Sequence, residues 1–235
     1  MQIKTKLQSS RIVILSGSGI SAESGLPTFR DSLGLWKSFS WKELASPQGW
    51  KTNTQAVLEF YNVRRAHAWS AQPNEAHKAI ASLEKYFDVI VVTQNVDDLH
   101  ERAGSSKVIH LHGQLTYARG TGSSSRRYRV DGAPITIGQL CEDGTQLRPD
   151  IVWFGEQVQF FDQAYNQIEK AEKILVVGTS LSVFPAASLV NAASRIAEKV
   201  IVYVDHVELP VGFTSLIGKA TEIVPVLVEK WIREI

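Results

Sequence analysis

The chain has almost no cysteine, no long apolar run and no surplus of either charge. With a single cysteine among 235 residues, it can form neither an internal disulfide nor a four-cysteine zinc site. No apolar run approaches the roughly 18–20 residues of a membrane-spanning helix, so we expect no membrane partner. Lysine and arginine together number 25 and the acidic residues 24. This balance predicts no general polyanion-binding surface and no nucleic-acid partner.

The amino terminus also lacks a targeting signal. MQIKTKLQSS is basic but has no apolar segment of the kind found in secretory signals. We therefore expect a cytoplasmic protein. We also expect a monomer. The length allows one substantial core, or a large domain with a smaller one attached.

Short apolar runs rich in β-branched residues are typical of buried parallel strands. The runs are Ile12–Leu15, Val89–Thr93, Val108–Leu111, Lys173–Val177 and Val200–Val204. Patterns typical of helices alternate with them, at Thr54–Trp69, Asn74–Phe87 (capped by Asn74), Pro185–Lys199 and Val224–Ile235. The alternation predicts an α/β fold with a doubly wound parallel sheet of the Rossmann-like kind. Ligands bind such sheets at the carboxyl ends of the strands.

Residues 114–148 break this alternation. They are rich in glycine, serine and arginine and contain only two short β-like pieces, Tyr128–Val130 and Ile135–Ile137. We expect a small inserted module of one or two antiparallel hairpins, with residues 32–70 as a second, helical part of the same layer. Hairpin hydrogen bonds would hold the module, together with packing of Tyr117, Tyr128, Val130 and Ile137.

The first apolar run leads into a glycine-rich turn, GSGISA (residues 17–22), which fits the G-x-G-x-x-(G/A) pattern of dinucleotide sites. Gly17 and Gly19 would let backbone amides approach a diphosphate, and Ala22 would pack the next helix against the strand. A tight turn that binds no ligand fits the same sequence pattern. The acidic residue that a dehydrogenase has about 20 positions further on, after a second strand, is missing. This disfavours a hydride-transferring dehydrogenase.

Two residues just beyond the turn, Phe29 and Arg30, could cover a ligand, or Arg30 could pair with Asp31. Gln94, Asn95 and Asp97 follow the second apolar run. Their amides and carboxylate suit ribose hydroxyls or a carboxamide. Asp97 or its neighbour could instead cap the next helix.

Two histidines, His110 and His112, are two residues apart and so share one face of a strand. A metal pair would need further ligands, and none is evident nearby. An imidazole at a strand end can serve as a general base near neutral pH. For His110 we expect a structural role, bonded to the backbone.

Two later segments, RPDIVWFGE (148–156) and VVGTSLSVFPAA (176–187), offer small side chains and backbone groups. Gly178, Thr179 and Ser180 could contact a nucleotide. Val152–Gly155 and Ser182–Phe184 could present two strand edges to an extended peptide. Taken alone, each segment is more often ordinary core or loop.

Together these motifs resemble the sirtuins, the NAD-dependent protein lysine deacylases. GSGISAESGLPTFRD, TQNVDDLHERAG, HLHG, IVWFGE and GTSLSVFPAA occur in the family's order, and the resemblance covers nearly all of the chain outside 114–147. It implies NAD as cofactor and an acylated lysine in a protein or peptide as substrate. It also implies an NAD-binding domain (1–31, 72–113 and 149–235), a cofactor loop with helices (32–71) and a small module (114–148).

The resemblance further implies a role for each motif. His112 would be the general base, with Asn95 beside it at the catalytic centre. The acyl oxygen would attack the ribose as nicotinamide leaves, and O-acyl-ADP-ribose and free lysine would result. The acyl-lysine peptide would bind Val152, Phe154, Gly155 and Val183. NAD would be held by Gly17, Ser18, Gly19, Ala22, Glu23, Phe29, Arg30, Gln94, Asn95, Asp97, Gly178, Thr179, Ser180 and Asp205.

The acyl group is indicated by Tyr61 and Arg64, three residues apart on one helix face. A guanidinium beside a phenol can bind a carboxylate. Tyr-x-x-Arg at this place is similar to the sirtuins that remove succinyl and malonyl groups, and the small Ala22 fits that too. By spacing alone, a core tyrosine beside a solvent-facing arginine is the simpler interpretation.

The main departure from the family is zinc. Sirtuins usually hold the small domain with two C-x-x-C pairs, whereas this region has only Cys141 and no histidine. Gly120 falls near one expected ligand position, and Leu140 or Asp143 near another. We expect a module without zinc. A non-catalytic NAD or ADP-ribose sensor and an ADP-ribosyl transferase stay open as alternatives, although Asn95 and His112 favour the deacylase.

Overall fold

In the part of the chain that the structure describes, the larger sheet has six strands, all pairs parallel, in the order β3-β2-β1-β7-β8-β9. The structure, a computed structural model, describes residues 10–28, 40–204 and 208–235. The strands are β1 (Arg11–Ser16), β2 (Asp88–Thr93), β3 (Val108–His110), β7 (Lys173–Val177), β8 (Glu198–Tyr203) and β9 (Thr214–Ile217). The strand order reverses between β1 and β7, where open α/β sheets bind their ligands. The predicted fold class is confirmed.

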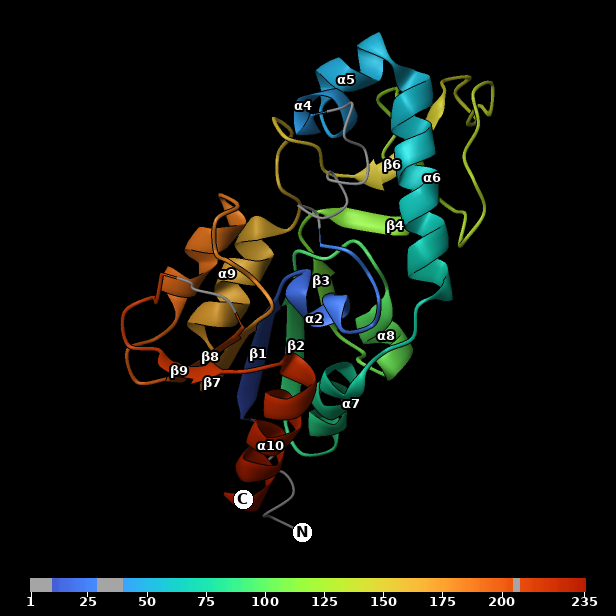
Figure 1. Ribbon diagram of the computed structural model, residues 1–235. Helices are drawn as coiled ribbons and strands as arrows, with labels where there is room; N and C mark the ends of the chain where they lie inside the picture. Colours follow the sequence, from blue (N-terminus) through green and yellow to red (C-terminus); the bar gives the residue numbers. More distant parts are fainter. Residues whose placement is uncertain (1–9, 29–39, 205–207) are drawn as a thin grey trace.

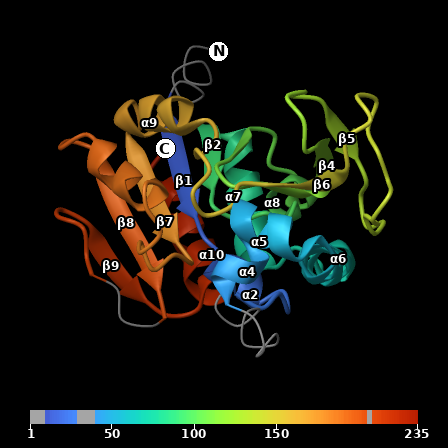
Figure 2. The same ribbon diagram turned by 90° about the horizontal axis from the view of Figure 1, so that it is seen from above.

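Helices cover both faces of this sheet, as Figures 1 and 2 show. Ile12 and Ile14 of β1 pack towards α7 (Glu75–Ser82) and α10 (Ala220–Arg233). Val13 and Leu15 pack towards α9 (Phe161–Glu169) and the 3₁₀ helix η2 (Ala186–Ala192). Because successive strand residues point to opposite faces, a continuous apolar run fills both cores.

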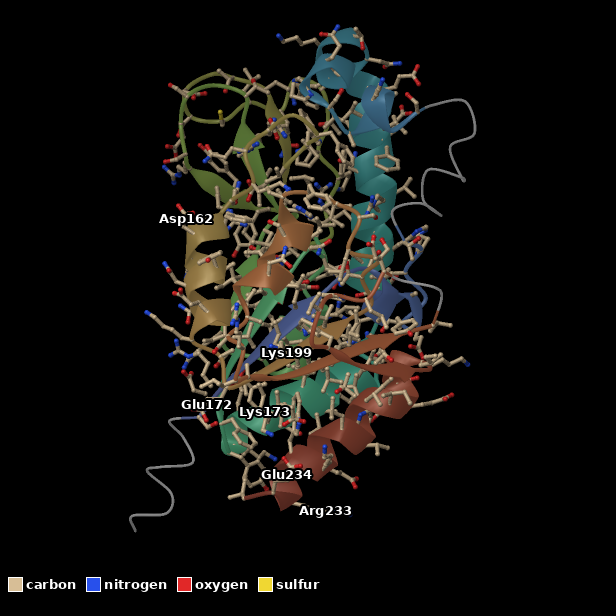
Figure 3. The ribbon with its side chains drawn as sticks, turned by 90° about the vertical axis from the view of Figure 1, so that its left-hand side faces the viewer. Asp162, Glu172, Lys173, Lys199, Arg233 and Glu234 are labelled. Atoms are coloured by element: carbon tan, nitrogen blue, oxygen red, sulfur yellow. The ribbon has the colours of Figure 1, made fainter. Side chains whose placement is uncertain are left out.

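Charged residues close the end of the sheet where β7 and β8 begin. Lys173 bonds to Glu198 and, at 3.0 Å, to Glu234 at the end of α10. Figure 3 shows Lys173 and Glu234 side by side there, well below Asp162 at the start of α9. This ionic cluster ties α10 to the sheet at the edge opposite the strands' carboxyl ends.

The prediction of a helix over Pro185–Lys199 is wrong. The chain forms only η2, and its residue Ala193 already has extended backbone angles. Ala186, Leu189 and Ala192 are buried, so apolar residues recur every three positions, the period of a 3₁₀ helix. The predicted cap at Asn74 is confirmed, since its side chain accepts from two amides of α7, which continues into the 3₁₀ turn η1 (Leu83–Lys85).

The smaller sheet is antiparallel, with strands β4 (Gly113–Gly120), β5 (Arg127–Arg129) and β6 (Leu147–Ile151) in the order β5-β4-β6. The expected strand at Ile135–Ile137 does not form, because the Asn62 side chain takes both the N–H and the carbonyl of Ile135. Ile135 is buried but Ile137 is 57% exposed, so the predicted packing by Ile137 is wrong. Its place in the core is taken by Ile135.

The helices α4 (Trp41–Leu44), α5 (Pro47–Thr52) and α6 (Thr54–Ser70) lie beside the smaller sheet (Figure 1). Two short helices, α2 (Gly19–Ala22) and α8 (Leu99–Ala103), follow β1 and β2. Within the residues that the structure describes, no helix is long and apolar enough to cross a membrane.

Candidate functional site

A cavity of ≈ 240 Å³ opens between the carboxyl edge of the larger sheet and the smaller sheet. Its walls come from the turns after β1, β2 and β3, from α6 and from the segment after β6. It brings together predicted residues that are far apart in the sequence: Ser18, Tyr61, Arg64, Gln94, Asn95, Asp97, His112, Val152, Phe154, Gly155 and Val183.

The other predicted residues do not line this cavity. Ala22 is exposed, so the prediction that it packs α2 against the strand is wrong, and the buried Ile20 does so. Glu23 bonds to Thr221 at the start of α10. Phe29, Arg30 and Asp205 lie outside the described residues. The remainder, Gly17, Gly19, Gly178, Thr179 and Ser180, form the turns after β1 and β7.

These two turns pack backbone against backbone. The N–H groups of Gly17 and Gly19 donate to the carbonyls of Val177 and Gly178, at 3.0 and 2.8 Å. A Cβ on Gly17 would lie 2.7 Å from the Gly178 oxygen. Glycine is therefore required here for the contact between the turns, and both amides are already used inside the protein. Gln94 reaches the same place, with its amide 3.4 Å from the Thr179 hydroxyl.

A buried polar cluster lies at the end of β2. Ser21 donates to Asp97 and accepts from the Asn95 amide, both at 3.1 Å. Asp97 also accepts from the N–H of Leu99, the first residue of α8, whereas the side chain of Asp98, at the N-cap position, makes no capping bond. Burial raises the pKa of Asp97 above its usual range. In the described part of the chain the buried Asn95 Oδ1 has no hydrogen-bond partner. A ligand amide or hydroxyl would satisfy it.

The two histidines have different surroundings. Both ring nitrogens of His110 are occupied, by the Asn95 carbonyl and by Glu101, so the expected structural role is observed. His112 Nδ1 lies 3.1 Å from the Gln94 carbonyl, which can only accept. The Nδ1 atom therefore carries the proton, and Nε2 keeps its lone pair. Burial lowers the pKa of His112 below its ordinary value, so the ring is a neutral base at neutral pH.

Tyr61 and Arg64 of α6 meet in the cavity, as the helix spacing predicted. Tyr61 is 2% exposed, and burial raises its pKa to about 12, so the phenol keeps its proton. Burial lowers the pKa of Arg64, while Tyr61 and Asp97 act against this shift. Arginine remains a cation even so. A neutral phenol donor and a guanidinium cation thus line one wall.

The segment after β6 is bonded to the histidine. The Val152 N–H donates to the His112 carbonyl at 2.9 Å, and the Phe154 N–H donates to the Ala45 carbonyl at 3.0 Å. Phe154 is 40% exposed and Phe184, across the cavity, 73%. Exposed aromatic rings at the rim of a cavity are typical of a surface that receives a ligand.

A structural zinc does not fit the residues present. In the described ranges no three His, Cys, Asp or Glu side chains gather as a metal site. The Cys141 thiol is bonded to Asp143 Oδ1 at 2.8 Å and to Thr145. A Cβ on Gly120 would lie 2.6 Å from the Cys141 sulfur, so protein atoms fill this space.

Ser21 and Trp153 are among the cavity residues that the sequence analysis did not assign to the site. Ser21 lies inside the glycine-rich turn, and its polar side chain was the available signal. Trp153 lies inside VWFGE and forms a wall of the cavity. No local pattern distinguishes a cavity tryptophan from a core one.

The sheet order, the paired turns at the switch point and the histidine beside the cavity define a nucleotide-binding α/β protein of the Rossmann-like class. The model of the Sir2 family matches residues 17–185, and the chain belongs to that family.

Relatives in sequence and structure cover nearly the same length. An NAD-dependent protein deacylase of Helicobacter pylori is 51% identical over 194 residues, 83% of this chain and 83% of that protein. NAD-dependent protein deacylase 1 of Archaeoglobus fulgidus is 43% identical over 233 residues, 96% of this chain and 95% of that one. A crystal structure of a Sir2 homologue with NAD has a TM-score of 0.86 and 40% identity, and covers 99% of this chain and 93% of its own.

Proposed function

We propose that this chain is an NAD-dependent protein lysine deacylase that releases nicotinamide and O-acyl-ADP-ribose. The observation that carries the proposal is the state of His112. Its Nδ1–H donates to a carbonyl and its Nε2 is unprotonated. Its ring lines the same cavity as Asn95 and Asp97. The names of the relatives support the same activity.

NAD, when bound, supplies the ribose that receives the acyl group and the nicotinamide that leaves. We assign its binding to the turns after β1, β2 and β7, with Asn95 and Asp97 holding amide and hydroxyl groups. Phe29, Arg30 and Asp205 complete this prediction. His112 Nε2 would take the proton of a ribose hydroxyl. The apolar side chains of the cavity, Leu115 and Trp153 among them, would exclude water.

For the acyl group we propose a preference for succinyl and malonyl at least equal to that for acetyl. A terminal carboxylate can accept from the Tyr61 hydroxyl and pair with the Arg64 guanidinium. Val152, Phe154, Gly155 and Val183 would hold the peptide in extended form. A monomeric state and a cytoplasmic location, without nucleic-acid or membrane partners, stay predictions from the sequence.

The test is a mass-spectrometric assay with NAD and matched succinyl-, malonyl- and acetyl-lysine peptides. Deacylation with release of one nicotinamide per lysine would support the proposal. Label transferred from NAD to protein without deacylation would favour an ADP-ribosyl transferase. Tight ADP-ribose binding with no nicotinamide release from any peptide would favour a sensor and refute the deacylase.

A further inference from the structure

An ion pair between Arg148 and Glu156 joins the two ends of the segment that runs from β6 to the cavity. Arg148 of β6 donates from both terminal nitrogens to the carboxylate of Glu156, at 2.6 and 3.1 Å. The Arg148 Nη2 atom also donates to the Ile151 carbonyl at 2.8 Å. The Arg148 side chain is 8% exposed. A bidentate pair of this kind fixes the orientation of both side chains.

Trp153 is held between these two residues. The Arg148 guanidinium carbon lies 3.2 Å from the centre of the Trp153 ring. The backbone N–H of Trp153 donates to the Glu156 carboxylate at 2.8 Å. On its other side the ring is 6.4 Å from that of Tyr61 and 5.5 Å from that of Trp50. The position of this cavity wall therefore depends on the Arg148–Glu156 pair.

The same pair joins the smaller sheet to the cavity. Arg119 of β4 reaches Glu156 at 3.3 Å and Asp150 at 3.8 Å. Next to Trp153, Val152 is bonded to the His112 carbonyl. The contacts thus run from β4 and β6 to the substrate segment and the histidine, in a module where no zinc site fits.

We infer that Arg148 and Glu156 are positioning residues for the acylated lysine, which hold Trp153 and residues 152–155 in binding geometry without a metal. The inference rests on the proposed function and deepens it. Loss of Glu156 leaves the Arg148 cation buried without its carboxylate, and loss of Arg148 leaves the partly buried Glu156 with Arg119 as its ionic partner, so in either variant we expect the segment to move. The nucleotide half of the cavity lies on other elements and is unaffected.

The experiment compares Arg148→Met, Arg148→Lys and Glu156→Gln with Arg126→Met. Arg126 is a matched control, because it pairs with Glu142 in the same module but both side chains are exposed. We expect Arg148→Met and Glu156→Gln to raise the KM for an acyl peptide at least about tenfold and to change the KM for NAD less than about twofold. Lysine at 148 keeps the charge but loses the flat stacking on Trp153, so its effect is intermediate.

A second readout is independent of turnover. The indole N–H resonance of Trp153, identified by its loss in Trp153→Phe, will shift in Arg148→Met and Glu156→Gln but not in Arg126→Met. An unshifted resonance in both variants overturns the inference, whether or not the wild type is active. A peptide KM equal to that of the control in an active protein also overturns it and leaves the proposed deacylase standing. If Arg148→Met does not fold, Glu156→Gln provides the same two readouts.

Discussion

Single hydrogen bonds decide the chemistry of this site. A carbonyl on Nδ1 leaves the His112 Nε2 lone pair available, whereas both ring nitrogens of His110 are occupied by partners within the protein. The two residues have the same side chain and lie two positions apart. Their hydrogen-bond partners alone distinguish the proposed base from the structural residue.

His112 is the first residue to test. His112→Tyr will lower kcat for every acyl peptide by about 10²- to 10⁴-fold, the usual contribution of a general base. Circular dichroism and the affinity for ADP-ribose will show whether the fold and the nucleotide site survive. A loss of less than about tenfold would mean that another group takes the proton.

Arg64 is the test of acyl preference. Arg64→Met removes the cation but keeps much of the apolar stem, so kcat/KM for succinyl peptides will fall about 10- to 100-fold more than for acetyl peptides. The comparison within one variant controls for general damage. Equal losses on both peptides would contradict a carboxylate-binding role.

At the scale of elements, turns and strand ends determine where the polar groups meet. Ser16 of β1 pairs with Thr93 of β2 and with Val177 of β7, so the residues that follow these three lie side by side. This alignment places the glycine-rich turn, Gln94 and Gly178 together. Parallel pairing therefore builds the site from three separate motifs.

Gly113 directly follows His112 and is the first residue of β4 in the smaller sheet. Its φ is +81°, and a Cβ would lie 2.0 Å from the backbone carbonyl oxygen of Asp150. Gly113→Ala will lower the free energy of unfolding by more than the roughly 1–3 kcal/mol of backbone strain, because backbone atoms must also move. Gly138 is the control, since its φ is +85° and nothing lies within 4 Å of its Cβ position.

Urea denaturation measures both variants. The loss of unfolding free energy in Gly138→Ala measures the backbone strain alone. The additional loss in Gly113→Ala measures the cost of the steric clash with Asp150. Similar losses in the two variants would show that the turn relaxes without cost.

Element prediction succeeded where burial leaves a strong pattern. The buried strands β1, β2 and β7 are continuous apolar runs and could be found. The edge strand β9 is largely exposed and gives no clear pattern, whereas the short helix α9, with Ala164 and Ile168 buried four residues apart, was not identified from the sequence. Which of Ile135 and Ile137 is buried depends on the bonds of Asn62 to the Ile135 backbone, and Asn62 lies more than 70 positions away.

At the scale of the whole molecule, a buried pair of histidines couples stability to pH. The rings of His77 and His100 lie 4.9 Å apart and both are buried. Burial lowers the pKa of His77 to about 4, and that of His100 well below its ordinary value. The unfolded chain, with histidine near 6.5, then binds protons that the folded chain does not.

Stability will therefore fall as the pH is lowered from about 6.5 towards 4. Between about pH 7.5 and 5, His77 accounts for about 2 kcal/mol of this loss, which His77→Gln will remove. Urea denaturation of both proteins at the two pH values measures it, with the exposed His67→Gln as control. Parallel losses in wild type and His77→Gln would contradict the assignment.

The sequence by itself determined the strand runs, the glycine-rich turn, the order of the motifs and the polar residues after each strand, because short-range periodicity records which side chains are buried. Only the tertiary structure decided that Tyr61 and Arg64 share a cavity with His112 and Asp97, and that Arg148 holds Trp153 against it. Contacts between distant segments depend on how the sheet is crossed and how the two sheets face one another. No local pattern of residues contains that information.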